Sequence, residues 1–266
     1  MAKLTKFAET IFMIAFFNPR YNNFENRLLD YIKHFDSKGE DFVKGQRNQI
    51  KLFKLDAFTI NIKSFKVPHL INQIVYKYFR KSKAKRSFEF ANKLSSLNVG
   101  TPAPIGFVEF FSSFGLQKSF YISEQLECDL TFRELIEIPD YPDRDAILRQ
   151  FTMFCHDLHQ KGIEFLDHSP GNTLIKKNAF GTYDFYLVDL NRMEFHKSMD
   201  FNSRMKNLCR LTPLKEMIVV MSNEYAKCSK ESEVLIFETL WKFTSDFQKQ
   251  FYRKKEMKRQ LKFWKK

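Results

Sequence analysis

The chain has 266 residues, 44 of them Lys or Arg and 31 Asp or Glu, which gives a formal charge of +13. Hydrophobic residues make up 44% of the chain and aromatic residues 16%, with only 8 Gly and 8 Pro, so a disordered or collagen-like chain is excluded. The four cysteines lie far apart and form no Cys-x-x-Cys pair, which argues against a disulfide framework or a zinc ribbon and for a reducing compartment.

The N-terminal segment is apolar but too short to cross a membrane. The longest unbroken apolar run, residues 11–17, has 7 residues, whereas about 20 are needed to span a bilayer. A removed signal peptide is disfavoured, because Glu9 interrupts the apolar stretch and the following Asn-Pro-Arg-Tyr is not a small-residue cleavage site. We therefore expect a cytoplasmic protein.

The first half of the chain predicts short strands with one helix among them. Apolar and polar residues alternate in the strand segments, and turn residues separate them. Residues 83–97 instead have helical spacing, followed by Gly100 and two prolines. The strands are expected at residues 42–44, 49–53, 58–65, 105–111 and 119–124.

The second half predicts mainly helices around two short strands. The first helix is expected over residues 144–161. Cys155, His156 and His159 lie on it without a further ligand cluster, so we expect them to pack rather than to bind a metal. The strands are expected at residues 173–175 and 185–188, joined by a hairpin near Gly181. Strands first and helices later favour an α+β protein of two lobes.

Residues suited to phosphoryl transfer gather in two neighbouring segments, 162–175 and 186–192. That reaction needs a carboxylate that accepts the proton of the attacking hydroxyl, and oxygen ligands for the magnesium ions that bridge the phosphates. One tight loop can supply Asp167 and Asn172, and Asp189 ends an apolar strand. Because a hairpin connects the two segments, we expect the three side chains to converge.

This pattern resembles the catalytic and metal-binding loops of the protein-kinase-like superfamily. Asp167 matches the catalytic Asp, and Asn172 and Asp189 match the two magnesium-binding residues. Asp-Leu-Asn-Arg at 189–192 is similar to the Asp-Leu-x-Arg of bacterial Kdo and heptose kinases, which phosphorylate the inner core of lipopolysaccharide. Leu-His-Gln-Lys-Gly-Ile at 158–163 also resembles the segment that leads into this catalytic loop.

The resemblance implies the protein-kinase-like two-lobe fold of the α+β class. A small β-rich N-lobe with an N-terminal extension and one main helix is expected over residues 1–126. A larger helical C-lobe is expected over residues 127–266, with the catalytic and metal-binding loops and a basic C-terminal helix.

The same resemblance assigns residues to ATP and its metal. Ile-Asn-Ile-Lys at 60–63 matches the Val-Ala-Ile-Lys strand, so Lys63 is expected to bind the α and β phosphates, with Glu89 as its ion-pair partner. The loop that covers the phosphates has a single glycine, Gly45, and Arg47 or backbone amides are expected to contact phosphate instead. The implied metal is Mg²⁺ or Mn²⁺.

Two residues depart from the pattern of protein kinases. Leu166 stands where those enzymes have an Arg before the catalytic Asp, and Ser169 stands where they have a Lys. Both departures argue against an ordinary Ser/Thr kinase. They favour a glycan or small molecule as the acceptor.

The candidate residues also have simpler structural explanations. The Asp, Ser, Pro, Gly and Asn of the 167–172 loop are turn formers, and Asp189 can be an ordinary acid at a strand end. Lys63 becomes a solvated edge lysine if the strand slips in register. Glu89 has a lysine four residues away on each side, with which it can pair on the helix surface.

The positive charge is concentrated in residues 76–86, at +6, and residues 249–266, at +8. Such segments bind polyanions, but no nucleic-acid motif accompanies them, so nucleic acid is not expected. The apolar residues of the second segment share one helical face: Phe247, Phe251, Met257, Leu261 and Trp264. The segment is either a membrane-surface helix or a terminal helix packed on its own domain.

The resemblance implies an ATP-dependent phosphotransferase that acts on a sugar hydroxyl, most directly that of Kdo in the inner core. Its expected partners are Kdo-lipid A and an anionic membrane surface, which would make it a peripheral protein on the cytoplasmic face of the inner membrane. One alternative is a kinase of the same fold for a protein or a small molecule. Another is a nucleotide-binding pseudokinase that serves as a membrane scaffold.

Overall fold

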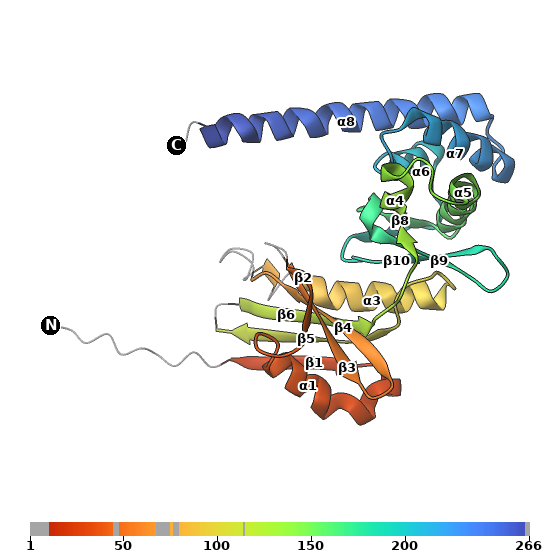
Figure 1. Ribbon diagram of the computed structural model, residues 1–266. Helices are drawn as coiled ribbons and strands as arrows, with labels where there is room; N and C mark the ends of the chain where they lie inside the picture. Colours follow the sequence, from red (N-terminus) through yellow and green to blue (C-terminus); the bar gives the residue numbers. More distant parts are fainter. Residues whose placement is uncertain (1–10, 45–47, 68–74, 77–79, 114, 264–266) are drawn as a thin grey trace. The chain divides into compact units, whose positions relative to one another are not determined.

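The computed structural model describes residues 11–44, 48–67, 75–76, 80–113 and 115–263 (Figure 1). The chain divides into two compact units, Met1–Leu126 and Glu127–Lys266. No strand pairs across the two units among the described residues, and each unit has its own hydrophobic core.

An antiparallel sheet of six strands forms the first unit, in the order β1-β5-β6-β4-β3-β2. The strands are β1 (Phe12–Phe17), β2 (Glu40–Lys44), β3 (Asn48–Leu55), β4 (Phe58–Phe65), β5 (Pro104–Ser112) and β6 (Gly115–Glu124). The alternation within β4 produces two faces, because Ile60 and Ile62 are fully buried whereas Asn61 and Lys63 are half-buried. The five strands expected from the sequence are confirmed, with small shifts at their ends.

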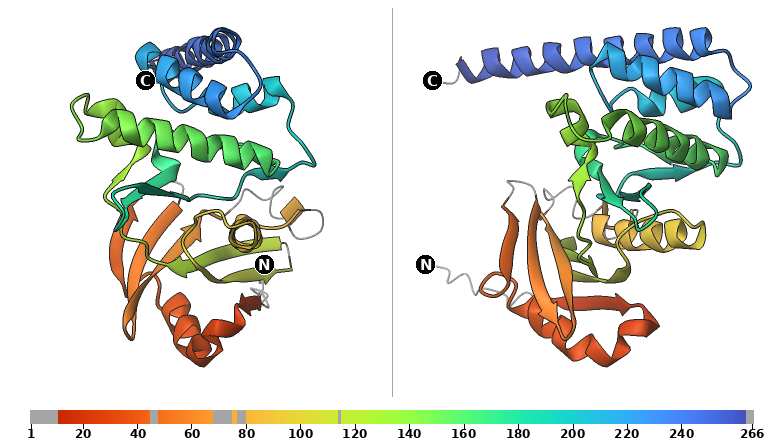
Figure 2. Two further views of the ribbon diagram at one scale, coloured as in Figure 1. Left: turned by 90° about the vertical axis from the view of Figure 1, so that its right-hand side faces the viewer. Right: turned by 45° about the vertical axis from the view of Figure 1, so that its right-hand side comes forward.

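Two helices cover opposite faces of this sheet (Figure 2). They are α1 (Glu25–Lys33), which follows a 3₁₀ turn at Pro19–Phe24, and α3 (Lys83–Ser96). Leu28 of α1 packs with Ile62 in one cluster, and Phe88 of α3 packs with Phe65 in another. The hydroxyl of Ser82 caps α3 by accepting a backbone N–H. The predicted helix at 83–97 is confirmed, whereas α1 was not expected.

The N-terminal apolar run forms the edge strand β1, which pairs antiparallel with β5. Much of its apolar surface stays exposed, since Phe12, Ile14 and Phe16 are each about half accessible. Consecutive apolar residues give no period of two, so the sequence did not indicate this strand. Among the described helices of the chain, none has the length and hydropathy of a membrane span.

The second unit is mainly helical. Its helices are α4 (Phe132–Glu137), α5 (Arg144–Gln160), α6 (Phe201–Leu208), α7 (Lys215–Cys228) and α8 (Glu233–Phe263). Its strands are β7 (Leu130–Thr131), β8 (Ile163–Phe165), β9 (Thr173–Lys177), β10 (Tyr183–Leu187) and β11 (Met193–Phe195). Phe132, Phe151 and Tyr225 are fully buried at the centre of its core.

These strands form two small sheets, β10-β9-β7 and β11-β8. The expected helix at 144–161 and the hairpin strands on either side of Gly181 are confirmed. The three-residue strands β8 and β11 were not predicted. A strand of that length is too short to show a period in the sequence.

The long helix α8 packs on its own unit only along its first half. Ile236, Leu240 and Thr244, spaced four residues apart, are buried against the rest of the unit, where α8 contacts α6 and α7. The C-terminal part of the helix projects past these neighbours (Figures 1 and 2). No described side chain from 249 to 260 is buried.

Candidate active site

The second unit brings the loops of Asp167, Asn172 and Asp189 together. Asn172 closes a 3₁₀ turn at Pro170–Asn172, and its Nδ2 donates to the backbone oxygen of Asp167 at 2.8 Å. The backbone oxygen of Asn172 accepts the N–H of Val188 at 3.0 Å, directly before Asp189. The predicted hairpin explains this geometry, because Thr173 at the start of β9 pairs with Leu187 at the end of β10.

Asp189 lies in a left-handed turn, with φ of 58°. Asp tolerates this conformation better than most residues, and such backbone is concentrated at functional sites. After the turn, β11 returns alongside β8, with Met193 opposite Phe165. The backbone N–H of Leu166 donates to the backbone oxygen of Arg192 at 3.2 Å. This hydrogen bond holds the Asp189 turn next to the Asp167 loop.

The donor atoms of this cluster suit a hard divalent cation. Because the amide nitrogen of Asn172 is held by Asp167, its Oδ1 points away from that bond. The carboxylate of Asp189 supplies further oxygen, and its Oδ1 accepts a hydrogen bond from Asn191 Nδ2 at 2.6 Å. Carboxylate and amide oxygens are the ligands that Mg²⁺ and Mn²⁺ prefer. Asn172 and Asp189 therefore fit the metal that the sequence implies.

Arg210 contacts the carboxylate of Asp167. Its Nη1 donates to Asp167 Oδ1 at 3.3 Å and to the backbone oxygen of Leu166 at 3.0 Å. Both charged side chains are about one third exposed. The guanidinium therefore holds the loop through a side-chain atom and a backbone atom together.

A buried polar network supports the loop from behind. His159 Nδ1 lies 2.9 Å from the hydroxyl of Tyr225, and its Nε2 lies 3.3 Å from Asn207 Oδ1. Asn207 in turn donates to the oxygen of Phe165, the last residue of β8, at 2.9 Å. Burial lowers the pKa of His159 to about 3, so the ring is neutral near pH 7. His159 is thus a packing residue, as the sequence predicted.

His168 lies inside the loop itself and is completely buried. Its ring packs against Phe165 and Phe151, with ring centres 5.4 and 5.7 Å apart. Burial lowers the pKa of His168 to about 4. This burial was not predicted, because His168 stands among turn-forming residues.

In the first unit, Lys63 lies on the sheet face that α3 covers. It is two residues from Phe65 on the same face, and its Nζ is 5.4 Å from the centre of that ring. Both carboxylate oxygens of Glu89 accept from Lys81 Nζ, at 2.8 and 2.9 Å. Lys81 was not anticipated as a partner, and the Lys63–Glu89 pair stays a prediction.

The remaining site predictions cannot be placed in this cluster. Gly45 and Arg47 lie outside the described residues. Lys63 and Glu89 belong to the first unit, whereas the Asp167, Asn172 and Asp189 loops belong to the second.

Comparisons with known proteins agree with these observations. The model of the lipopolysaccharide kinase (Kdo/WaaP) family matches residues 63–231. The structure is similar to one described as WaaP in complex with acyl carrier protein, with a TM-score of 0.59 and 13% identity over 90% of this chain and 98% of that one. This likeness shows the protein-kinase-like fold that the sequence predicted. A comparison with curated protein sequences gives no significant match.

Proposed function

Because the chain belongs to the lipopolysaccharide kinase (Kdo/WaaP) family, and is therefore a sugar kinase of the lipopolysaccharide core, we propose that it phosphorylates a hydroxyl of Kdo with ATP. The observation that carries this proposal is the meeting of the Asp167, Asn172 and Asp189 loops. Their side chains are the groups that phosphoryl transfer needs, and a merely structural turn has no need for all three.

Asp167 is the proposed catalytic residue. Its carboxylate positions the sugar hydroxyl and accepts the proton as the oxygen attacks the γ-phosphorus of ATP. A new O–P bond forms, the bond from the γ-phosphorus to the bridging oxygen breaks, and its electron pair leaves with ADP. Arg210 and the Asn172 side chain hold this loop in place before the substrate arrives.

Three other residues are proposed to bind the nucleotide and its metal, and a fourth to orient one of them. Asn172 and Asp189 would hold Mg²⁺ or Mn²⁺, which would neutralise phosphate charge. Lys63 binds the α and β phosphates. Glu89 is proposed to orient Lys63. Its carboxylate, which accepts from Lys81 in the structure, must then exchange this contact for one with Lys63.

We also propose that the protein works on the cytoplasmic face of the inner membrane, held there by α8. The projecting half of this helix exposes Phe251, Tyr252 and Met257 among lysines and arginines. Each Lys or Arg near an anionic leaflet contributes about 1 kcal/mol to binding. Such a helix needs no membrane span to reach a lipid-linked acceptor.

The test is phosphate transfer from ATP to Kdo-lipid A by the purified protein, followed by mass spectrometry. Asp167→Asn keeps the shape of the side chain but removes the base, so we expect the rate to fall about 100-fold or more. Binding of a fluorescent ATP analogue should stay within about twofold, because the nucleotide contacts are elsewhere.

Asp157→Asn is the matched control, because Asp157 is exposed on α5 and pairs with Lys161 there. It should keep the full rate. Transfer to another acceptor but not to Kdo-lipid A would overturn the choice of Kdo. An unchanged rate in Asp167→Asn would overturn the proposed mechanism.

A further inference from the structure

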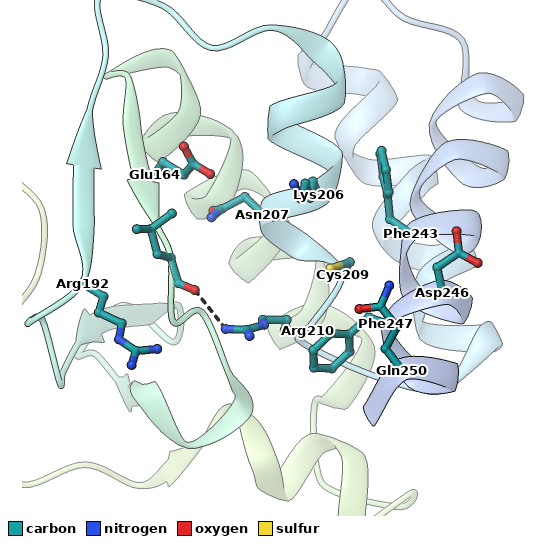
Figure 3. Close-up of a pocket in the computed structure, with 11 residues that line it drawn as sticks. Glu164, Arg192, Lys206, Asn207, Cys209, Arg210, Phe243, Asp246, Phe247 and Gln250 are labelled. Carbon is teal, nitrogen blue, oxygen red and sulfur yellow. Dashed lines mark hydrogen bonds between the residues drawn. The ribbon is translucent and has the colours of Figure 1, made fainter. Parts of the chain in front are cut away.

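A pocket of about 620 Å³ lies beside the Asp167 loop, within the second unit (Figure 3). It is enclosed by the loop after β8, the end of α6 and the middle of α8. Its lining residues are Glu164, Leu166, Arg192, Lys206, Asn207, Cys209, Arg210, Phe243, Asp246, Phe247 and Gln250. The proposed phosphoryl transfer assigns no role to this pocket.

The charges of the lining favour an anion. Arg192, Lys206 and Arg210 contribute three cations, against two acids, Glu164 and Asp246. Glu164 is already engaged, since its Oε2 lies 2.9 Å from Nε2 of His196. Within the part of the chain that the structure describes, the side chains of Arg192 and Lys206 have no hydrogen-bond or ion-pair partner. Cations in this state are available to a ligand.

Arg210 also retains unused donors. Its hydrogen bonds to the described residues all come from Nη1, whereas a guanidinium has five N–H groups. The group lies over Phe247, 5.1 Å from the ring centre, and the two side chains are neighbours in Figure 3. Such stacking orients the planar donors that bind carboxylates and phosphates in pairs.

The pocket is joined to the reaction centre by the same residue. Nη1 of Arg210 contacts Asp167 Oδ1 and the oxygen of Leu166, the latter drawn as the dashed line in Figure 3. An anionic group bound by Arg210 therefore lies next to the proposed base. The rings of Phe243 and Phe247 add an apolar wall, as is usual in pockets for small organic ligands.

We propose that this pocket is the acceptor site and that Arg210 binds an anionic group of an acidic sugar, which sets the sugar hydroxyl beside Asp167. The inference rests on the proposed function, because it names the part of the acceptor that the kinase recognises. Kdo fits the requirement, since it carries a carboxylate close to its hydroxyls. Arg210 is then a residue that determines acceptor specificity.

The test uses the full chain, with free Kdo as the binding probe and a neutral hexose as the comparison ligand. Arg210→Gln should weaken Kdo binding at least about tenfold, the loss of one charge-assisted contact. The affinity of Arg210→Lys for Kdo should lie between those of the wild type and Arg210→Gln, because Lys keeps the charge but lacks the paired donors. Binding of the neutral hexose should not change.

Steady-state kinetics with Kdo-lipid A give a second measurement. In Arg210→Gln the KM for the acceptor should rise at least about tenfold while the KM for ATP stays the same. Arg192→Gln is the second variant, because Arg192 lines the pocket without contacting Asp167 in the described part of the chain. It should raise the acceptor KM by a smaller factor even if Arg210→Gln folds poorly.

Lys230→Gln removes an exposed cation of the same unit outside the pocket and is the matched control. Unchanged Kdo binding in both arginine variants overturns the proposal, even if Kdo-lipid A is phosphorylated. An equal rise of both KM values also overturns it. If the wild-type protein binds acidic sugars through Arg210 but does not phosphorylate Kdo-lipid A, the pocket is supported and the choice of Kdo fails.

Discussion

At the scale of single residues, Asp167 is held by one partner from its own turn, Asn172, and by one from a distant part of the chain, Arg210. Asp167 and Asn172 are five positions apart in one turn, so their meeting follows from local geometry. Arg210 is 43 positions from Asp167 and reaches it only because α6 packs behind β8. No local pattern reports such a contact. Lys81 was not predicted for a different reason: it precedes the N-cap of α3, eight positions from Glu89, whereas helical spacing points to lysines four positions away.

Asn172 combines a proposed role in metal binding with an observed role in the shape of the loop. Asn172→Ala removes the proposed metal oxygen and the hydrogen bond to the Asp167 backbone. We expect the rate to fall about 100-fold and the Mg²⁺ concentration for half-maximal rate to rise. Asn202→Ala, at an exposed position of α6, should change neither. A rate loss with an unchanged Mg²⁺ dependence would show that Asn172 only shapes the loop.

At the scale of elements, the sequence predicted those with a clear period or strong turn residues. β4 alternates along its length, and α5 carries an apolar stripe, so both were found. β1 is a run of apolar residues at a sheet edge, and β11 has three residues. Both owe their structure to the strands they pair with, β5 and β8, which a single sequence does not reveal.

The projecting half of α8 left two interpretations open, lipid binding and packing. Its side chains Phe251 and Tyr252 are more than half exposed. Changing both to Ser should therefore weaken binding to vesicles that contain phosphatidylglycerol, with the lysines and arginines left to hold the rest. Neutral vesicles should bind weakly from the start, and high salt should weaken binding to the anionic ones. Cosedimentation measures each of these.

The same double variant distinguishes the packing interpretation. If α8 binds lipid, the urea unfolding midpoint of the double variant should stay close to that of the wild type, since exposed residues contribute little to stability. A clear fall in the midpoint with unchanged vesicle binding would show that these rings pack against protein. Leu261 lies on the predicted apolar face too, but its side chain is outside the described part of the helix.

At the scale of the whole molecule, the predicted fold class holds because strand and helix patterns are segregated along the chain. The first unit is a sheet with helices on its two faces, and the second is built mainly of helices, with two small sheets. In the second unit the loop that carries Asp167 packs on a core in which two histidines, His159 and His168, are buried. Stability of this unit is therefore linked to pH.

The sign of that dependence follows from the two pKa values. Burial lowers the pKa of His159 to about 3 and of His168 to about 4, against about 6.5 in an unfolded chain. Below pH 6.5 the two histidines bind protons in the unfolded state but stay neutral in the folded state. The free energy of unfolding therefore falls as the pH drops towards 4. Each histidine contributes up to about 1.4 kcal/mol per pH unit in this range, and neither contributes a slope above it.

Urea unfolding at about pH 7.5, 6.5, 5.5 and 4.5 measures this loss of stability. Carboxylates titrate mainly near the lowest of these pH values, so the higher ones report on the histidines. His168→Phe keeps an aromatic ring between Phe151 and Phe165 but has no proton to bind. We expect it to remove at least about a third of the slope between pH 6.5 and 5.5, because His159 and the partly buried His156, whose pKa is also lowered by burial, still titrate on unfolding. A slope identical to that of the wild type would mean that His168 is protonated in the folded protein, and that the loop carrying Asp167 is open to water rather than sealed by the core.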